Sequence, residues 1–401
     1  MTQEDIYQRL AKHLSELPIG YPYRDSLVEM LKENFSKQEA EVALAIPSDV
    51  TPLKPLAVGE IARNTSLTKE QVRETLEGLT KRGLVYVGKT ADGDTGYALH
   101  QVGFGFPQTF FWKGEETPHV RRMAELTAKY FSREVTRESF SPTKTKAYRY
   151  IPVEKSLKPA KQGVYPQQLM TQVIEQAEVI ALGHCPCRMA YSLRGGKCDH
   201  PKEVCLKFNR MARYVIERGL AREITKQEAH EIIRKAEEEG LVHFVDNTEG
   251  DIQHNCNCCG CACWNVGNIR RGKIPRDVIM ATYFLRETDL DQCIGCGECV
   301  EICPVAAVKL EDDRPVVDEE WCIGCGVCAR VCPTDSISMK VRPDREGQLP
   351  ASNFDELHER IKAEKKTATL SPEGGREPID GQGPAPGQEA VDRSLHSAGK
   401  G

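Results

Sequence analysis

Residues 293–304 read CIGCGECVEICP, and residues 322–333 read CIGCGVCARVCP. In both stretches four cysteines follow the spacing Cys-x2-Cys-x2-Cys-x3-Cys, and a proline comes directly after the fourth. Glycines between the first three cysteines let the backbone turn tightly, because glycine has no Cβ atom. The pattern therefore predicts two related loops whose thiol groups converge on shared centres, and this repeat decides the fold of the segment around it.

The chain has 401 residues and 17 cysteines, and all of the cysteines lie between Cys185 and Cys332. In a large chain without a secretory leader, this clustering indicates metal binding rather than a disulfide scaffold. An uninterrupted four-cysteine run closed by proline is typical of [4Fe–4S] ligands, whereas zinc usually takes paired Cys-x2–4-Cys units. We therefore expect two [4Fe–4S] clusters here, with two zinc sites as the weaker alternative. Because oxygen degrades such clusters, we also expect an anaerobic setting.

Residues 284–341 resemble the two-cluster bacterial ferredoxins, over about fifty residues or roughly an eighth of the chain. The resemblance implies a compact, pseudo-symmetric α+β module that carries single low-potential electrons. It also implies that the fourth cysteine of each run binds the cluster of the other run. One cluster would have the ligands Cys293, Cys296, Cys299 and Cys332, and the second would have Cys322, Cys325, Cys328 and Cys303. The candidates for an apolar shell around the clusters are Ile294, Val305, Ile323 and Val331.

A second field of nine cysteines precedes this segment and does not match the ferredoxin spacing: Cys185, Cys187, Cys198, Cys205, Cys256, Cys258, Cys259, Cys261 and Cys263. Side chains two residues apart on an extended backbone point in opposite directions. A Cys-x-Cys pair therefore needs a turn to chelate one ion, and Pro186 and Gly260 are placed to supply it. Because a polynuclear cluster tolerates more widely spread thiolates, we favour one or two further iron–sulfur clusters. Structural zinc and buried or redox-switching thiols stay open as alternatives.

Other residues in this field have weaker implications. The sequence Cys258-Cys259-Gly260 is similar to the Cys-Cys-Gly element of heterodisulfide-reductase subunits, but the wider spacing differs and implies no catalytic role. Neighbouring histidines are expected beside the ligands or at the surface rather than as ligands; they are His184, His200 and His254. Three cations either offset thiolate charge or are solvated: Arg188, Arg194 and Lys197. If eight of the nine cysteines bind two clusters, one thiol is left over.

Charge and hydropathy exclude some classes of protein. The formal net charge of −5 is that of an ordinary protein, not of a polybasic nucleic-acid binder. No apolar stretch is long enough to cross a bilayer. The first residues, MTQED, lack the basic and then apolar pattern of a signal peptide. We therefore expect a cytoplasmic protein without a membrane span, long enough for two or three domains.

We expect an α+β multidomain architecture. Helices are predicted over residues 1–45, where Ile6, Leu10 and Leu14 recur at helical spacing. The following divisions are a winged-helix-like region (46–105), a mixed connector (106–165), a mostly helical cysteine-rich domain (166–280), the ferredoxin-type module (284–341) and a low-complexity tail (342–401). Within the middle domain, helices are expected near 203–217 and 226–238. The tail is polar and expected to be disordered, apart from a helix near Phe354–Lys365.

The winged-helix-like region has a helix start at Thr68, with Gln71 three residues later as a capping box. Its helix is expected to end at Gly83, and a hairpin turn follows around Asp92-Gly93-Asp94. The exposed face of this helix combines basic and acidic side chains: Lys69, Arg73, Glu70, Glu74 and Glu77. The positive charge that binds phosphates therefore does not accumulate there. DNA binding is therefore disfavoured, and docking to a protein partner is expected.

Together these patterns predict an iron–sulfur electron-transfer protein that serves a redox partner or an oxidoreductase complex. The sequence contains no Gly-x-Gly-x-x-Gly element opening a dinucleotide-binding unit and no Walker A motif. Hydride or two-electron chemistry is therefore assigned to a partner, no catalytic residue is named, and a stand-alone enzyme is not expected. Two alternatives stay open: a redox-sensing winged-helix transcription regulator, and a reductase with a catalytic cluster in the middle domain.

Overall fold

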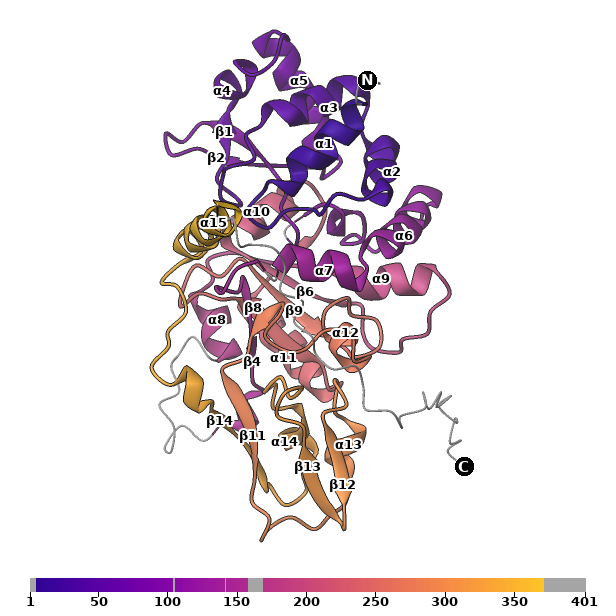
Figure 1. The fold of residues 1–401 in the computed structure, drawn as a ribbon, viewed down its shortest axis with the longest axis vertical. Coiled ribbons are helices and arrows are strands. Elements are labelled where there is room, and N and C mark those ends of the chain that lie inside the picture. The colour runs from indigo at the N-terminus through magenta and orange to yellow at the C-terminus, as the bar shows by residue number, and fades with distance from the viewer. Residues whose placement is uncertain (1–4, 104, 141, 158–168, 371–401) are drawn as a thin grey trace.

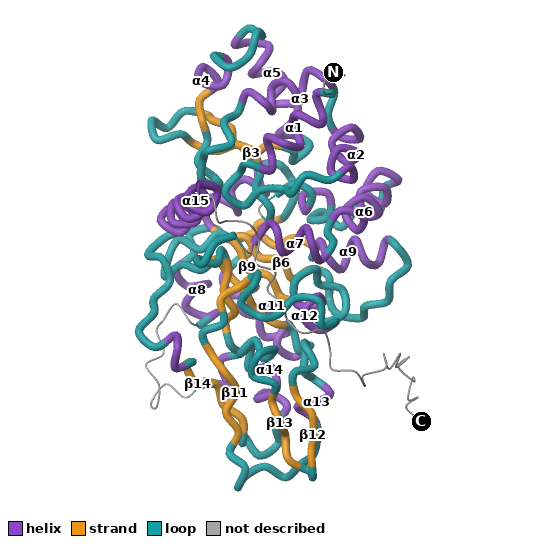
Figure 2. Tube along the Cα trace, in the orientation of Figure 1, coloured by secondary structure: helices purple, strands orange, loops and turns teal. Residues whose placement is uncertain are grey.

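The computed structural model describes residues 5–103, 105–140, 142–157 and 169–370. Figure 1 shows an elongated molecule with the N-terminal helices at one end and the ferredoxin-like segment, residues 284–341, at the other. Figure 2 shows that the strands concentrate between these ends and in the ferredoxin-like segment itself. The central sheet therefore separates the N-terminal helices from the two cysteine runs.

The N-terminal region packs helices around a three-stranded sheet of order β1-β3-β2. The helices are α1 (Ile6–Ser15), α2 (Asp25–Asn34), α3 (Lys37–Ala45), α4 (Val58–Ala62) and α5 (Lys69–Lys81), and the strands are β1 (Leu56–Ala57), β2 (Val85–Lys89) and β3 (Thr95–Leu99). The predicted capping box is present, because the Gln71 backbone N–H donates to Thr68 Oγ1 at 3.3 Å and the Thr68 N–H donates to Gln71 Oε1 at 2.9 Å. The expected helices and hairpin are thus observed, while the winged-helix assignment stays a prediction.

The N-terminal sheet rests on helix α10 (Asn209–Glu217) of the middle domain. Tyr214 of α10 donates from its hydroxyl to the Val85 carbonyl at 3.4 Å, and it lies 3.1 Å from Nε2 of His100. The rings of Tyr86 and Tyr214 also contact each other, with centroids 5.1 Å apart. His100 is buried at this junction, so its protonation state matters for how the two parts hold together.

We predict that this junction loses stability as the pH falls below about 6.5. Burial lowers the pKa of His100 to about 3, so its imidazole is neutral in the folded protein and binds a proton more readily when unfolded. Because protonation favours the unfolded state, the contribution of His100 should fall by about 2 kcal/mol between pH 6.5 and pH 5. Denaturant unfolding at several pH values should show a smaller pH dependence for His100→Gln. An unchanged dependence in the variant would contradict the prediction.

The connector, residues 106–165, follows the N-terminal region in the sequence and contributes one strand to the sheet of the middle domain. Its elements are η1 (Gln108–Phe110), α6 (Pro118–Tyr130), α7 (Arg133–Phe140), β4 (Tyr148–Ile151) and η2 (Glu154–Ser156). Its strand β4 has all four side chains buried. The region is therefore not a separate connector, because β4 lies inside the sheet of the middle domain.

The middle domain is built on a seven-stranded sheet of order β10-β4-β8-β9-β6-β5-β7. Only the β10–β4 pair is parallel. Besides β4, the strands of this sheet are β5 (Ile180–His184), β6 (Glu203–Phe208), β7 (Arg222–Ile224), β8 (Val242–Asp246), β9 (His254–Cys258) and β10 (Met280–Ala281). Its helices, besides α10, are α8 (Met170–Gln176), α9 (Pro186–Leu193), α11 (Lys226–Glu238) and α12 (Val266–Arg270).

Alternation along strand β6 divides the domain into an apolar side and a cysteine side. Leu206 and Phe208 join a buried cluster with residues of α8 and α11. Cys205 and Lys207 face the other way and line a cavity. This follows from the two-residue side-chain period of a strand, and it places the cysteine chemistry on one face of the sheet.

The prediction of a mostly helical middle domain is corrected by this sheet. Residues 203–208 were expected to begin a helix but form β6, and residues 180–184 form β5. Both strands are buried on both faces, so their apolar residues form short runs that do not distinguish a strand from a buried helix. The helix expected at 226–238 is confirmed as α11.

The ferredoxin-like segment contains two antiparallel strand pairs and two short helices. Strand β11 (Phe284–Thr288) pairs with β14 (Ile337–Val341), and β12 (Val308–Glu311) pairs with β13 (Arg314–Val317). Helices α13 (Glu298–Glu301) and α14 (Val327–Val331) begin after Gly297 and Gly326, and each contains the third cysteine of its run. The two runs thus have the same local structure, as their shared spacing predicts.

The C-terminal tail is only partly as predicted. After η5 (Pro343–Arg345), helix α15 (Phe354–Leu370) buries Phe354, Leu357 and Ile361 against the rest of the molecule. The helix expected near Phe354–Lys365 is thus confirmed as α15, whereas the disorder expected for residues 342–353 is wrong; residues 371–401 lie outside the described residues. The spacing of three, four and seven residues between these apolar side chains is that of a helix face.

Within the described ranges, no helix is both long enough and apolar enough to span a lipid bilayer.

Candidate metal centres

The first set of cysteines in the ferredoxin-like segment surrounds one cavity. Its walls include Cys293, Cys296, Cys299 and Cys332, so three residues of the first run meet the last residue of the second run. Ile294 also lines the cavity, but its side chain is 66% exposed. The expectation that Ile294 shields the site from water is therefore wrong, whereas Ile323 and Val305 are buried as expected.

Polar groups contact the sulfur atoms of this first set. Arg286 Nη2 donates to Cys299 Sγ at 3.4 Å, and Ser336 Oγ lies 3.2 Å from Cys332 Sγ. Burial opposes ionisation of Cys332, but hydrogen bonds from Ser336 and Thr334 lower the pKa of its thiol to about 7. Thiolate is the form that binds metal, so these contacts favour the ligating state and would tune the potential of a bound cluster.

The second set comprises Cys303, Cys322, Cys325 and Cys328. Burial is the main cause that raises the pKa of Cys328 to about 12; Arg286 opposes the shift, and the charges of Cys322 and Cys303 add to it. Burial also raises the pKa of Cys325, with Cys328, Cys303 and Cys322 adding to the shift. The four thiols thus lie within electrostatic reach of one another. Because the pKa values of Cys303, Cys325 and Cys328 are all raised, these three free thiols stay protonated, and metal binding there must release protons.

Residues 286–339 match the family model of the 4Fe-4S dicluster domain. Ferredoxin-2 of Desulfomicrobium norvegicum is 54% identical over 28 residues, which are 7% of this chain and 48% of that protein. A probable ferredoxin of Methanosarcina thermophila is 52% identical over 27 residues, 7% of this chain and 47% of that protein. The chain thus spans about half the length of the curated relatives it matches. No solved structure matches it.

Three cysteines and a histidine of the middle domain form a compact group: Cys198, His200, Cys259 and Cys261. Their ligand atoms all lie within 4.8 Å of one another. The sulfur–sulfur separations are 3.1 Å (Cys198–Cys261), 3.2 Å (Cys259–Cys261) and 3.8 Å (Cys198–Cys259). The turn that begins at Gly260 lets Cys259 and Cys261 face the same side, as the sequence required for chelation.

The remaining six cysteines of the middle domain line one cavity: Cys185, Cys187, Cys205, Cys256, Cys258 and Cys263. The cavity volume is about 80 Å³. Its other walls are mainly aromatic side chains: Trp112, Phe131, Phe140, Tyr148, Phe244 and Trp264. The sulfur atoms of Cys258 and Cys263 lie 3.3 Å apart. We call this the six-cysteine cavity.

Buried cations compensate thiolate charge in the six-cysteine cavity. Lys207 is buried with its ammonium 4.7 Å from the centroid of the Trp112 ring. Burial opposes protonation of His254, but Asp246, 3.1 Å away, raises the pKa of the imidazole. Hydrogen bonds from Cys205 and Cys258 hold the pKa of Cys256 well below its usual range. Thiolates next to cations suit a metal centre that needs deprotonated ligands.

Arg188 links the six-cysteine cavity to the compact group. Its guanidinium is 1% exposed and donates to the carbonyls of Pro201 and Asn257, the latter at 2.5 Å. Burial opposes its charge, but Cys185 of the cavity and Cys259 of the compact group raise the pKa of Arg188. Of the three candidate cations in the sequence, Arg188 is therefore a buried counter-ion, whereas Arg194 and Lys197 are exposed.

The dicluster domain packs against the middle domain through its second cysteine set. The backbone N–H of Val153 donates to the Cys325 carbonyl at 3.0 Å, and Arg270 Nη1 donates to the Cys303 carbonyl at 2.7 Å. A Cβ atom on Gly260 would lie 2.1 Å from the Pro304 carbonyl oxygen. Only glycine therefore permits the close approach between the cysteine turn of the middle domain and the dicluster domain.

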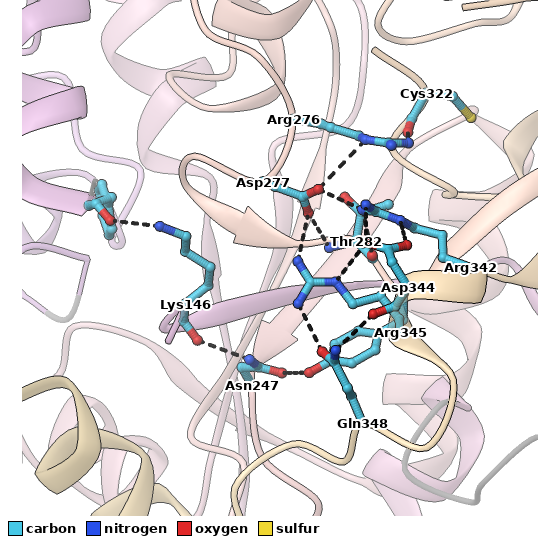
Figure 3. Close-up of polar contacts among 12 residues, drawn as sticks. Lys146, Asn247, Arg276, Asp277, Thr282, Cys322, Arg342, Asp344, Arg345 and Gln348 are labelled. Carbon is cyan, nitrogen blue, oxygen red and sulfur yellow. Dashed lines mark hydrogen bonds and ion pairs between the residues drawn. The ribbon is translucent and has the colours of Figure 1, made fainter. Parts of the chain in front are cut away.

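Figure 3 shows the polar network beside this contact. Asp277 lies at its centre, where Oδ2 accepts from Arg342 Nη1 at 2.6 Å and Oδ1 accepts from the Thr282 N–H at 2.9 Å. Arg276 Nη1 donates to the Cys322 carbonyl at 3.0 Å. The network fixes the second cysteine set relative to the sheet.

Tyr150 of β4 is a buried residue that the sequence did not single out, and thiols of two cysteine sets contribute to its electrostatic environment. Burial raises the pKa of Tyr150, and Cys263, Cys258 and Cys325 raise it further. Its hydroxyl is therefore neutral and within electrostatic reach of thiols from both the six-cysteine cavity and the dicluster domain. The only sequence signal was a polar strand, YRYI, of residues 148–151, whose position depends on long-range sheet pairing.

Proposed function

We propose that this chain transfers single electrons between a redox partner and an iron–sulfur centre in its own middle domain. The match of residues 286–339 to the 4Fe-4S dicluster domain supports electron-transfer chemistry. The observation that supports the rest is the direct contact between the two cysteine-rich regions, where Arg270 donates to the Cys303 carbonyl at 2.7 Å and Gly260 packs against the Pro304 carbonyl. The chain would thus contain a relay of clusters rather than an isolated ferredoxin.

The ligand assignment follows the two sets of thiols. The first cluster would take Cys293, Cys296, Cys299 and Cys332, which line one cavity, and the second would take Cys322, Cys325, Cys328 and Cys303. When bound, each cluster accepts and returns one electron. The protein supplies hydrogen bonds to sulfur, such as that from Arg286 to Cys299, which help to set the reduction potential.

A third cluster is proposed for the six-cysteine cavity. The cavity offers six thiols, more than the four that a [4Fe–4S] cluster needs. It is flanked by buried cations that balance thiolate charge and by aromatic walls that restrict water. The order of transfer is then partner, first cluster, second cluster and central cluster, because the second cysteine set is the one in contact with the middle domain.

The partner is proposed to bind at the tip formed by β12 and β13, which lies at the far end of the molecule from the N-terminal helices (Figure 1). Ile294 and Leu310 line the cavity of the first cysteine set. Large apolar side chains are exposed on this segment: Leu290, Ile294, Leu310 and Val316. Residues 289–320 contain ten Asp or Glu and only two Lys or Arg. An apolar patch within an acidic field suits a redox partner with a basic face.

We predict that removing two of these charges slows association with a basic partner. Asp312 and Asp313 occupy the β12–β13 turn with φ values of 49° and 55°, a conformation that asparagine also tolerates. Asp312→Asn/Asp313→Asn should lower the bimolecular rate of electron transfer to a basic cytochrome by about threefold at low salt. The difference should vanish near 1 M salt, where the Debye length is about 3 Å.

A matched control is available at the opposite end of the molecule. Asp92→Asn/Asp94→Asn changes the same number of charges in the β2–β3 turn and should leave the rate unchanged. Equal slowing by both double variants would show that net charge, not this tip, governs the encounter.

The proposed function is tested by counting iron. Protein purified without oxygen should contain about twelve irons per chain, four for each of three clusters. Changing Cys187, Cys258 and Cys263 together to alanine leaves only three thiols in the six-cysteine cavity, fewer than the four that complete ligation of a cubane needs. This triple variant should contain about eight irons and keep the electron paramagnetic resonance signals of the dicluster domain. A wild-type content of eight irons would refute the central cluster, and the absence of any cubane signal would refute the whole proposal.

A further inference from the structure

We propose that Cys198, His200, Cys259 and Cys261 bind one zinc ion, separate from the iron–sulfur clusters. A tetrahedral zinc ion, with Zn–S bonds of about 2.3 Å and Zn–N bonds of about 2.0–2.1 Å, spaces its ligand atoms by about 3.8 Å between sulfurs and about 3.6 Å between sulfur and nitrogen. His200 Nδ1 lies 3.5 Å from Cys198 Sγ and 3.7 Å from Cys261 Sγ. Both separations agree with a shared tetrahedral ion.

The sulfur atoms fit the same geometry. Cys198 and Cys259 are 3.8 Å apart, the tetrahedral value, while the two shorter separations of 3.1 and 3.2 Å both involve Cys261. Cys261 is exposed, so its side chain has room to move outwards by the few tenths of an ångström required. None of these separations approaches the S–S bond length of about 2.05 Å, so the group is not a disulfide.

The spacing differs from that of a cluster site. A four-iron cluster places each thiolate on a different iron, so its sulfur ligands lie further apart than those of a single ion. In the part of the chain that the structure describes, the compact group is the one set of three or more Cys, His, Asp or Glu ligand atoms within 4.8 Å of one another. No three of the dicluster cysteines, which the family model assigns to cluster chemistry, are that close.

The local fold shows what such an ion would do. Cys198 and His200 lie in the loop between α9 and β6, and Cys259 and Cys261 lie in the turn after β9. A zinc ion would cross-link these two loops, and four protein ligands would fill its coordination sphere, as in structural zinc sites. Because Cys258 and Cys263 flank the same turn, the ion would also position thiols of the six-cysteine cavity.

This inference replaces the expectation that the nine cysteines share one or two clusters with one thiol left over. They divide instead into six around the cavity and three in the compact group, and His200 is a ligand rather than a neighbour of ligands. The zinc site stands independently of the proposed central cluster, since neither set of ligands includes a residue of the other.

The test uses the full chain, produced with iron and zinc in the medium, purified without oxygen and washed with EDTA. We expect about one zinc per chain, with X-ray absorption showing three sulfurs at about 2.3 Å and one nitrogen at about 2.0–2.1 Å. Cys261→Ala should lose the zinc and keep its iron. His200→Cys should keep about one zinc, now with four sulfurs and no nitrogen.

Cys187→Ala is the matched control, because it removes a thiol of the cavity and should leave the zinc in place. Zinc that is lost in the EDTA wash, or that persists in Cys261→Ala, would be an adventitious ion only and would overturn the proposal. Loss of iron together with zinc from Cys261→Ala would assign the thiol to a cluster instead. The His200→Cys variant is informative even if zinc stays bound, because the ligand atoms change. An unchanged X-ray absorption spectrum in this variant would exclude His200 as a ligand.

Discussion

Alanine at Cys332 is expected to remove the same cluster as alanine at Cys293, although the two residues belong to different cysteine runs. Both thiols line one cavity, so each variant leaves the same cluster with three ligands. Electron paramagnetic resonance of the reduced protein should lose one and the same signal in both variants, with a loss of up to about four irons. Cys303→Ala should remove the other signal, because Cys303 lies with Cys322, Cys325 and Cys328.

Double variants distinguish two ligands of one cluster from substitutions that destabilise the whole domain. Cys293→Ala/Cys332→Ala should lose no more iron than either single variant, because both changes affect one cluster. Cys293→Ala/Cys303→Ala should lose up to about eight irons, four from each cluster. If Cys332→Ala instead removes the signal that Cys322→Ala removes, each run binds its own cluster and the crossed assignment is wrong.

Replacing Arg188 with leucine is expected to destabilise the middle domain by about 3–5 kcal/mol. The guanidinium is buried among the thiols of both middle-domain centres and donates to two backbone carbonyls. Its loss leaves buried thiolates without a counter-ion and buried carbonyls without donors. Anaerobic denaturant unfolding and metal analysis should show lower stability and reduced occupancy of both centres.

Arg194 provides the control, because it follows the same helix, α9, but is exposed. Arg194→Leu should change stability by no more than about 0.5 kcal/mol. Arg188→Lys should recover part of the loss, since lysine restores the charge but not the planar pair of donors. Full metal content in Arg188→Leu would show that the buried charge is not needed.

The structure of the dicluster domain was largely predictable from sequence, because its determinants are local. The spacing of each run fixes a turn and a short helix, and the β12–β13 hairpin turns within four consecutive residues, Glu311-Asp312-Asp313-Arg314. In that turn Asp312 and Asp313 have positive φ values, which Asp adopts more readily than most residues. The comparison with known families agrees with this part of the sequence interpretation.

The middle domain was less predictable because its sites form through long-range pairing. Cys205 of β6 and Cys256 of β9 line the same cavity because these strands pair, with Leu206 opposite Asn255. Sequence spacing could not show which of the nine cysteines would face the cavity. The buried helix α15 was underestimated for a related reason: its apolar spacing was visible, but the surface that it covers is assembled from distant segments.

Time-resolved reduction of the central cluster tests the relay most directly. The full protein is mixed with a reduced basic electron donor, frozen at intervals and examined by electron paramagnetic resonance, and Cys303→Ala/Cys322→Ala is compared with the parent. The account predicts that the central signal grows in only after the dicluster signals in the parent protein. The variant retains the six-cysteine cavity. Its central-cluster signal should grow no faster in the presence of the basic electron donor than in the presence of a small-molecule reductant alone. Equal rates of central-cluster reduction in the two proteins would contradict electron transfer through the second cluster.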